Sequence, residues 1–165
     1  MSLLVHARTS SDPAAVARDF AADTSAWLPA IRFDENHRWY SRVAATTDYE
    51  IWLLTWLPGQ RTGIHDHGGS AGAFVVAQGT LREDTVDQPW SDGLDGSRVR
   101  VSSALFGAGS VRRFDRHHVH EVVNDGVVPA VSVHAYAPSL GSMSRYRLEG
   151  DVLRVTASER AGADW

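Results

Sequence analysis

The chain has 165 residues, of which 43% are hydrophobic and 22% are charged, and these values fit one globular domain and exclude a disordered or collagen-like chain. The formal net charge of −4 argues against nucleic acid as a partner, and no apolar run approaches the roughly 20 residues of a membrane-spanning helix. The absence of cysteine excludes disulfides, a cysteine nucleophile and thiolate-bound zinc.

The N-terminal part of the sequence predicts a helix. Met1 to Ser11 contains Arg8 but no apolar h-region, so we expect no secretory signal and a cytoplasmic location. Ser11-Asp12-Pro13 supplies a cap and a proline for the first helical turn, and Trp27-Leu28-Pro29 is expected to end or restart the helix. An apolar stripe that could cover a sheet edge follows the cap, with Ala14, Val16, Ala17, Phe20, Ala21 and Ala22.

From about residue 38 onward the sequence predicts strands. Short β-branched and aromatic runs alternate with Gly, Pro, Asn and Asp, which is typical of an antiparallel barrel or sandwich. The expected strands are 49–57, 73–77, 81–86, 99–103, 119–123 and 130–137. Residues 87–97 are expected to form a loop. The prediction is a single all-β domain over 1–165, with a mainly helical cover at 1–37, a barrel at 38–155 and a loosely packed tail at 156–165.

Two short histidine clusters indicate a metal site. His65 and His67 would share one face of a strand, where two imidazoles can bind one ion, although an isolated His-x-His is more often two exposed side chains. His120 begins the string His-x3-Asn that ends at Asn124. His118 shares the strand face of His120, so a register error would exchange them. Three imidazoles without thiolates suit iron, zinc, copper or nickel.

The spacing Gly-x5-His-x-His-x4-Gly-x6-Gly, from Gly59 to Gly79, resembles the first motif of the cupin barrels, and His-x3-Asn resembles the end of the second. The cupin Glu that often follows His-x-His is replaced by Gly72, and the usual Pro-x-Gly before the third histidine is absent. The closer resemblance is to the cysteine dioxygenases, the thiol dioxygenases of the cupin superfamily. It extends over roughly residues 39–138 and rests on Tyr40-x-Arg42, Ile64-His65-Asp66-His67, Ser70, Gly79-Thr80-Leu81-x-Glu83, His120-x-Val122-x-Asn124 and the segment 129–138 with Ser132-x-His134-x-Tyr136.

This resemblance implies a cupin-type, jelly-roll-like antiparallel barrel and an Fe(II)-dependent enzyme that adds both atoms of O2 to the sulfur of L-cysteine. His65, His67 and His120 match the iron ligands. The other matches are Tyr136 as the active-site tyrosine, Ser132 and His134 as residues that orient its hydroxyl, Arg42 with Tyr40 as the substrate carboxylate site, and Trp56 near the site. Animal enzymes carry, at the position of Gly72, a cysteine crosslinked to the tyrosine, so the glycine favours the bacterial branch.

Two other functions stay open. The same chemistry on 3-mercaptopropionate or another small thiol acid would use similar residues, although members with that preference tend to carry Gln at the position of Arg42. A non-catalytic cupin that binds a ligand through its metal would not need Tyr136 and His134. No role is implied for His117 and His118, and a monomer that binds neither nucleic acid nor membrane is expected.

Overall fold

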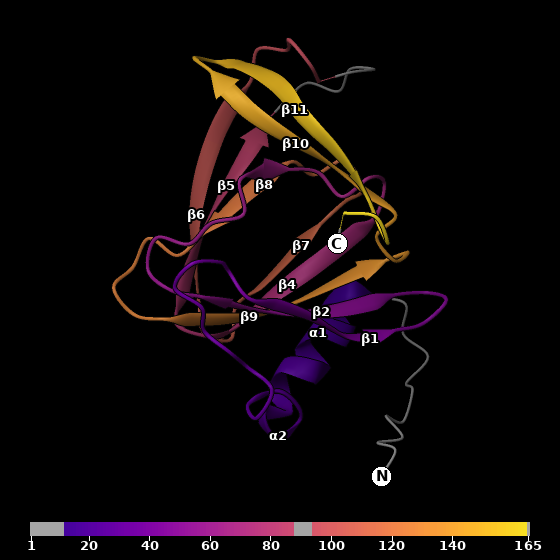
Figure 1. Ribbon diagram of the computed structural model, residues 1–165, viewed down its shortest axis with the longest axis vertical. Helices are drawn as coiled ribbons and strands as arrows, with labels where there is room; N and C mark the ends of the chain where they lie inside the picture. The colour runs from indigo at the N-terminus through magenta and orange to yellow at the C-terminus, as the bar shows by residue number, and fades with distance from the viewer. Residues whose placement is uncertain (1–11, 88–93, 165) are drawn as a thin grey trace.

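The computed structural model describes residues 12–87 and 94–164, and its strands form two antiparallel sheets. The first has the order β1-β2-β9-β4-β7 and the second β11-β10-β3-β8-β5-β6 (Figure 1). The bounds are β1 Tyr40–Ala45, β2 Glu50–Trp56, β3 Ile64–His65, β4 Ala71–Gln78, β5 Thr80–Asp87, β6 Arg100–Gly107, β7 Val111–Phe114, β8 His120–Val123, β9 Ala130–Ala137, β10 Ser142–Glu149 and β11 Val152–Arg160. The predicted antiparallel all-β fold is therefore confirmed.

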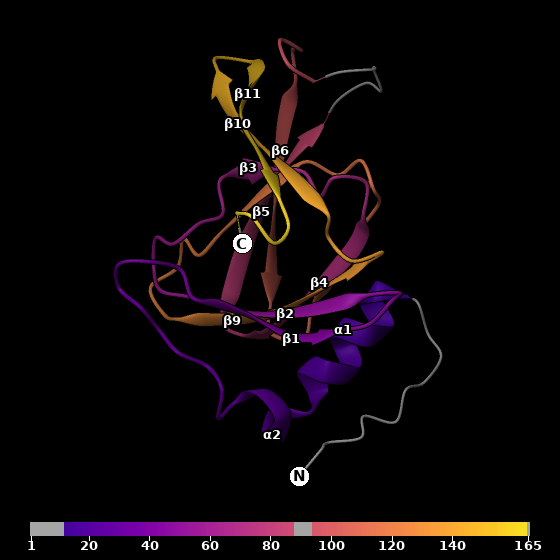
Figure 2. The same cartoon turned by 45° about the vertical axis from the view of Figure 1, so that its right-hand side comes forward.

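Two helices cover the outer face of the first sheet. Helix α1 (Pro13–Ala22) begins after Asp12, whose side chain accepts a hydrogen bond from the Ala14 backbone N–H, and α2 (Thr24–Trp27) ends where Trp27-Leu28-Pro29 predicts. Helix α1 packs on β4 and β9, which are inner strands of this sheet, so it covers the sheet face and not an edge (Figure 2). The edge prediction is wrong because the apolar stripe is wide enough to lie across the central strands.

Strand β9 separates the two cores. Its odd-numbered residues Val131, Val133 and Ala135 pack under the helices, and its even-numbered residues face the other sheet. Both faces are buried because each is covered by another layer, which explains the almost uninterrupted apolar run in this strand. Period-two alternation thus places Ser132, His134 and Tyr136 together on the inner face.

The prediction of a loosely packed tail at 156–165 is wrong for residues 156–160. Residues 156–160 belong to β11, which pairs with β10 along its length and forms one end of the second sheet. These strands carry many polar residues and are only partly buried, so their pattern lacks the apolar alternation that predicts a strand. Strands β1 and β7 were not predicted either, and of the predicted loop, residues 88–93 lie outside the described residues. No helix in the described part of the chain is long and apolar enough to cross a membrane.

Candidate metal centre

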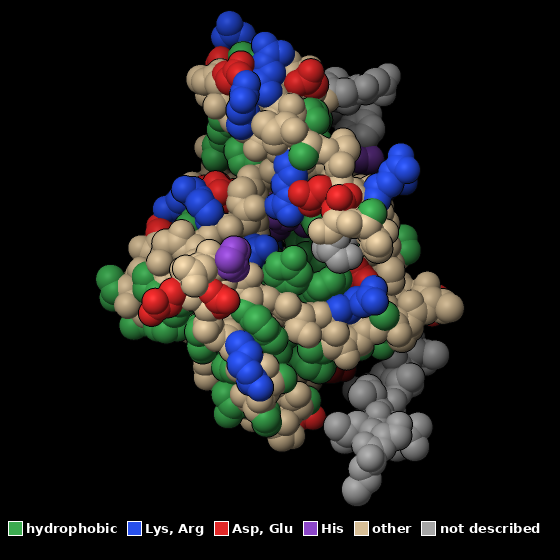
Figure 3. Space-filling view, in the orientation of Figure 1, with side chains coloured by type: hydrophobic (Ala, Val, Ile, Leu, Met, Phe, Trp, Pro, Cys, Tyr) green, Lys and Arg blue, Asp and Glu red, His purple; other side chains and the backbone are tan. Residues whose placement is uncertain are grey.

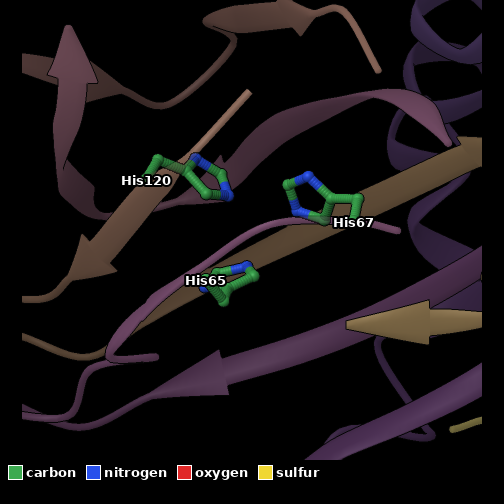
Figure 4. A group of neighbouring side chains, drawn as sticks. All are labelled: His65, His67 and His120. Atoms are coloured by element: carbon green, nitrogen blue, oxygen red, sulfur yellow. The ribbon is translucent and has the colours of Figure 1, made fainter. Parts of the chain in front are cut away.

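Three histidines from distant segments meet between the two sheets. His65 ends β3 and pairs directly with His120, the first residue of β8, whereas His67 lies in the loop after β3 instead of on the strand. Their ring centroids are 4.7–4.9 Å apart, and their candidate ligand atoms lie within 4.8 Å of one another. Figure 4 shows the three rings turned toward a common point.

The three imidazoles are deeply buried, with 5%, 0% and 1% of His65, His67 and His120 exposed. Burial lowers the pKa of His65 and His67 well below the usual imidazole range, and it lowers the pKa of His120 to about 4 despite a hydrogen bond to Glu83. All three rings are therefore neutral near pH 7. A neutral imidazole is the form that binds a metal.

The nitrogen atoms of these rings fit a metal ion. His65 Nδ1 donates to the Gly63 carbonyl at 2.9 Å, and His120 Nδ1 lies 2.7 Å from Glu83 Oε1, which leaves both Nε2 atoms free of these bonds. Both ring nitrogens of His67 are buried and have no hydrogen-bond partner among the described residues. A buried polar atom without a partner is costly, so a metal ion bound by His67 would satisfy a real requirement of this site.

A cavity of about 260 Å³ opens beside the histidines. Figure 3 shows a hollow near the middle of the molecular face, with arginine and acidic side chains beside it. The cavity is lined by His65, His120, His134, Tyr136, Arg38, Arg145, Tyr40, Glu159, Asp164, Thr62 and the apolar side chains of Trp52, Leu54, Val122, Leu140 and Met143. Its wall thus combines candidate metal ligands, arginine cations and two phenols.

Arg38 is the cation of this cavity without an acidic partner among the described residues. Its Nε and Nη1 atoms are buried and have no hydrogen-bond partner in the described chain, and its guanidinium lies 4.9 Å from the Trp56 ring. Burial and the nearby Arg145 lower the pKa of Arg38 to about 10, which still leaves it charged at neutral pH. Arg145, by contrast, donates to Glu159 at 3.1 Å and to the Thr62 carbonyl at 2.9 Å.

A chain of hydrogen bonds ends at Tyr136. Trp56 Nε1 donates to Ser132 Oγ at 2.9 Å, Ser132 Oγ lies 2.9 Å from His134 Nε2, and His134 Nδ1 lies 3.4 Å from the Tyr136 hydroxyl. Burial lowers the pKa of His134, so its ring is neutral, and burial raises the pKa of Tyr136, so its hydroxyl stays protonated. The residues that the sequence groups as Ser-x-His-x-Tyr are thus connected in space.

Comparison with known proteins identifies the family. The family model described as Cysteine dioxygenase type I matches residues 6–148. The chain belongs to this family. It is 29% identical to cysteine dioxygenase type 1 of Danio rerio over 119 residues, which cover 70% of this chain and 59% of the relative, and 26% identical to that of Homo sapiens over 128 residues, which cover 75% and 62%. The chain thus spans about three fifths of the length of these curated relatives.

The fold is also that of the cupins. A protein of Thermus thermophilus, TT1209, matches with a TM-score of 0.56 and 20% identity over 68% of this chain and 93% of its own. A cupin superfamily protein of Desulfitobacterium hafniense matches with a TM-score of 0.52 and 14% identity over 67% and 86%. These matches confirm the predicted cupin-type barrel.

Within this cysteine dioxygenase family member, not every residue expected at the substrate site lines the cavity. Tyr40 does, but Trp56 lies behind Arg38 and is fully buried. Arg42 is outside the cavity lining: its side chain is 55% exposed, and its Nη1 lies 3.6 Å from Glu50 Oε2. Arg42 pairs with Trp52 of β2, and its guanidinium lies 5.9 Å from the Trp52 ring.

Sequence reasoning missed several residues of the site. Arg38 lies two residues before Tyr40, so the alternation Arg-x-Tyr-x-Arg was the one available signal that it shares a face with Tyr40. Arg145 and Met143 lie on the unpredicted strand β10. The resemblance included Glu83 without giving it a role, and it gave no role to His118. In the structure, Glu83 is hydrogen-bonded to both His118 and His120.

Proposed function

We propose that this chain is a thiol dioxygenase that converts L-cysteine and O2 to cysteine sulfinic acid with Fe(II). The observation that carries the proposal is one cavity lined by His65 and His120 of the neutral histidine triad and by Arg38, whose buried Nε and Nη1 atoms have no partner in the described chain. The reaction balances as R–SH plus O2 to R–SO2H: the sulfur loses four electrons, dioxygen takes them, and both oxygen atoms stay in the product. No external reductant is needed.

His65, His67 and His120 would hold the metal through nitrogen, a donor set that suits Fe(II) among other first-row ions. Three protein ligands leave coordination positions open, so a bound Fe(II) would bring the thiol sulfur and dioxygen together. An all-histidine set leaves the charge of the ion uncompensated, which favours an anionic thiolate as the incoming group. The apolar walls formed by Leu54 and Val122 limit water near that group.

We propose Arg38, in place of Arg42, as the group that holds the substrate carboxylate. A guanidinium offers a planar pair of donors that matches a carboxylate, and the buried donors of Arg38 have no other partner in the described chain. Arg42 is half exposed and already lies near Glu50. The ring of Tyr40, 5.8 Å from the Arg38 guanidinium, supports its orientation.

Tyr136 is proposed to donate a hydrogen bond to the oxygenated sulfur group as it forms. Ser132 Oγ accepts from Trp56, so its own hydrogen is available to His134 Nε2. His134, neutral, then carries its proton on Nδ1 and donates toward the Tyr136 oxygen. The phenolic hydrogen of Tyr136 is left to point into the cavity.

The negative charges at the cavity favour L-cysteine over 3-mercaptopropionate. Asp164 lines the same cavity as the two arginines, whereas Glu159 is already paired with Arg145, so the ammonium group of a zwitterion has an acidic partner at the cavity and a simple anion gains nothing from it. The carboxylate site itself serves both thiols. A cytoplasmic location and a monomeric state remain predictions from the sequence.

The deciding experiment is oxygen uptake by the iron-loaded protein, offered L-cysteine and 3-mercaptopropionate in parallel, with the sulfinate quantified. One O2 consumed per cysteine sulfinate formed is the expected result. Faster uptake with 3-mercaptopropionate would keep the chemistry and overturn the substrate. Uptake with neither thiol, at one iron per chain, would favour a non-catalytic binding module.

The carboxylate site is tested by comparing variants of Arg38 and Arg42. Arg38→Ala should raise the KM for cysteine at least tenfold, because a charged hydrogen bond contributes about 1.5–3 kcal/mol, and Arg38→Lys should recover part of that loss. Arg98→Gln removes an exposed arginine paired with Asp151 and serves as the control. A larger KM increase in Arg42→Ala than in Arg38→Ala would return the carboxylate site to Arg42.

A further inference from the structure

Glu83 is a buried carboxylate at the centre of a hydrogen-bond network. It lies on β5 with 1% of its surface exposed, and its Oε1 is 2.7 Å from both His118 Nε2 and His120 Nδ1. Its Oε2 accepts from Arg112 Nε at 2.6 Å. The guanidinium of Arg112 on this oxygen makes an ion pair with Glu83, so the buried carboxylate is held in its charged form.

An ionised carboxylate can only accept hydrogen bonds, which determines the form of the His120 ring. His120 Nδ1 must carry the hydrogen, so its Nε2 has the free lone pair that a metal requires. His65 has a neutral carbonyl in the equivalent position, and His67 has no partner on either nitrogen among the described residues. Of the three ligands, His120 is thus the one held by a charged group.

His118 supports the same centre from two directions. It donates or shares a hydrogen with Glu83, and its ring stacks on Phe114 at 5.1 Å with 14° between the planes. Phe114 stacks in turn on His67, at 4.7 Å and 20°. His118, which is not one of the three candidate ligands, is therefore connected to His120 through Glu83 and to His67 through Phe114.

We propose that Glu83, held in place by His118 and Arg112, is a positioning residue that fixes the Nδ1–H form of His120 and so determines how tightly the histidine triad binds its metal. The inference rests on the proposed metal site but not on the thiol substrate. Outer partners of metal-bound histidines orient the ring and increase its basicity, and their loss weakens metal binding by roughly 10–100-fold.

The same three side chains could instead bind a metal ion of their own. Glu83, His118 and His120 lie within the distances at which three side chains can share an ion. The Arg112 guanidinium on the other oxygen of Glu83 would repel a cation there, and the 2.7 Å separations are those of strong hydrogen bonds. Hydrogen bonding is therefore the better interpretation, and metal stoichiometry distinguishes the two.

The test is the metal affinity of Glu83→Gln, measured on the full chain with Zn(II) or anaerobic Fe(II) against a chromophoric chelator. The variant keeps the shape and removes the charge, so we expect affinity to fall roughly 10–100-fold. Glu121→Gln is the matched control: it lies beside His120 on β8 and pairs with Arg61 outside the metal centre. Its affinity should equal that of the parent.

A purely structural role is separated by two further measurements. The visible spectrum of the Co(II)-loaded protein should change in Glu83→Gln, because this spectrum reports the donor strength of the metal ligands. If Glu83 only stabilised the fold, the protein molecules that still bind Co(II) would have the spectrum of the parent. His118→Gln leaves the triad and Glu83 in place, and it should weaken metal binding in the same direction but less. It also keeps the test available if Glu83→Gln does not fold.

Two results would overturn the proposal. One is unchanged affinity and an unchanged Co(II) spectrum in Glu83→Gln. The other is two metal ions bound per parent chain, with one lost in His118→Gln, which would make Glu83 a ligand of a second ion. Because these measurements use neither thiol nor oxygen, a protein that binds metal as expected but consumes no oxygen would contradict the proposed function and leave this inference intact.

Discussion

Gly72 occupies a place in the barrel where the smallest side chain is already too large. It lies on β4 opposite Phe114 of β7 and Tyr136 of β9. A Cβ atom at this position would lie 2.6 Å from two ring carbons of Phe114 and 2.8 Å from the Ala135 carbonyl oxygen. Carbon atoms prefer separations of about 3.5–4.0 Å, so the ring would have to move by roughly 1 Å.

We therefore expect Gly72→Ala to lower the free energy of unfolding by about 1–3 kcal/mol, the usual cost of an overpacked core. The displaced Phe114 ring stacks on His67, so metal affinity should fall as well. Urea unfolding of the metal-free protein measures the first effect, and chelator competition measures the second. Gly141→Ala is the control, because a Cβ there meets no atom within 4 Å.

A double variant isolates the steric cause. Gly72→Ala/Phe114→Leu lacks the phenyl ring that the new Cβ would meet. Its loss of unfolding free energy should therefore be smaller than the sum of the two single-variant losses by about 0.5–3 kcal/mol. Compensation will be partial because the Ala135 carbonyl remains. If Gly72→Ala unfolds at the same urea concentration as the parent and binds metal equally well, the steric reasoning is refuted. The same clash predicts that Gly72→Cys alone does not form a crosslink with Tyr136, which intact mass would check by the loss of two hydrogens.

Three further outcomes are expected. Ser132→Ala leaves the buried Trp56 Nε1 without its acceptor, so urea unfolding should show a loss of about 1–3 kcal/mol. Removal of the metal by a chelator should lower the melting temperature, since an ion held at 100 times its Kd stabilises the folded state by about 2.7 kcal/mol; equal melting curves would argue against a bound ion. Burial raises the pKa of Asp84, but its hydrogen bonds to Arg82 and Ser103 outweigh this and lower it. Its contribution is present above pH about 4 and is lost as the pH falls through the folded-state pKa, so Asp84→Asn should flatten the acid side of the stability profile.

A strand buried on both faces, such as β9, can be predicted from its nearly continuous apolar run. Strand β9 was predicted with its observed bounds because the helices cover one face and the second sheet the other. Strands β10 and β11 were missed because they are half exposed and rich in arginine and serine. What makes them strands is their pairing with each other and with β3, which is a long-range property.

The donor set and its local spacing were determined by the sequence itself. Without cysteine, imidazole is the main donor that suits iron, zinc, copper or nickel, His-x-His brings two rings together, and Ser-x-His-x-Tyr lies on one face of one strand. Which charged groups surround that site was decided only by the tertiary structure. Arg38 and Arg42 share an alternating pattern, but Arg38 lines the cavity whereas Arg42 lies outside its lining, near Glu50. Arg145 and Glu159 reach the same cavity from a segment about a hundred residues away, because pairing between strands, and not sequence proximity, sets these contacts.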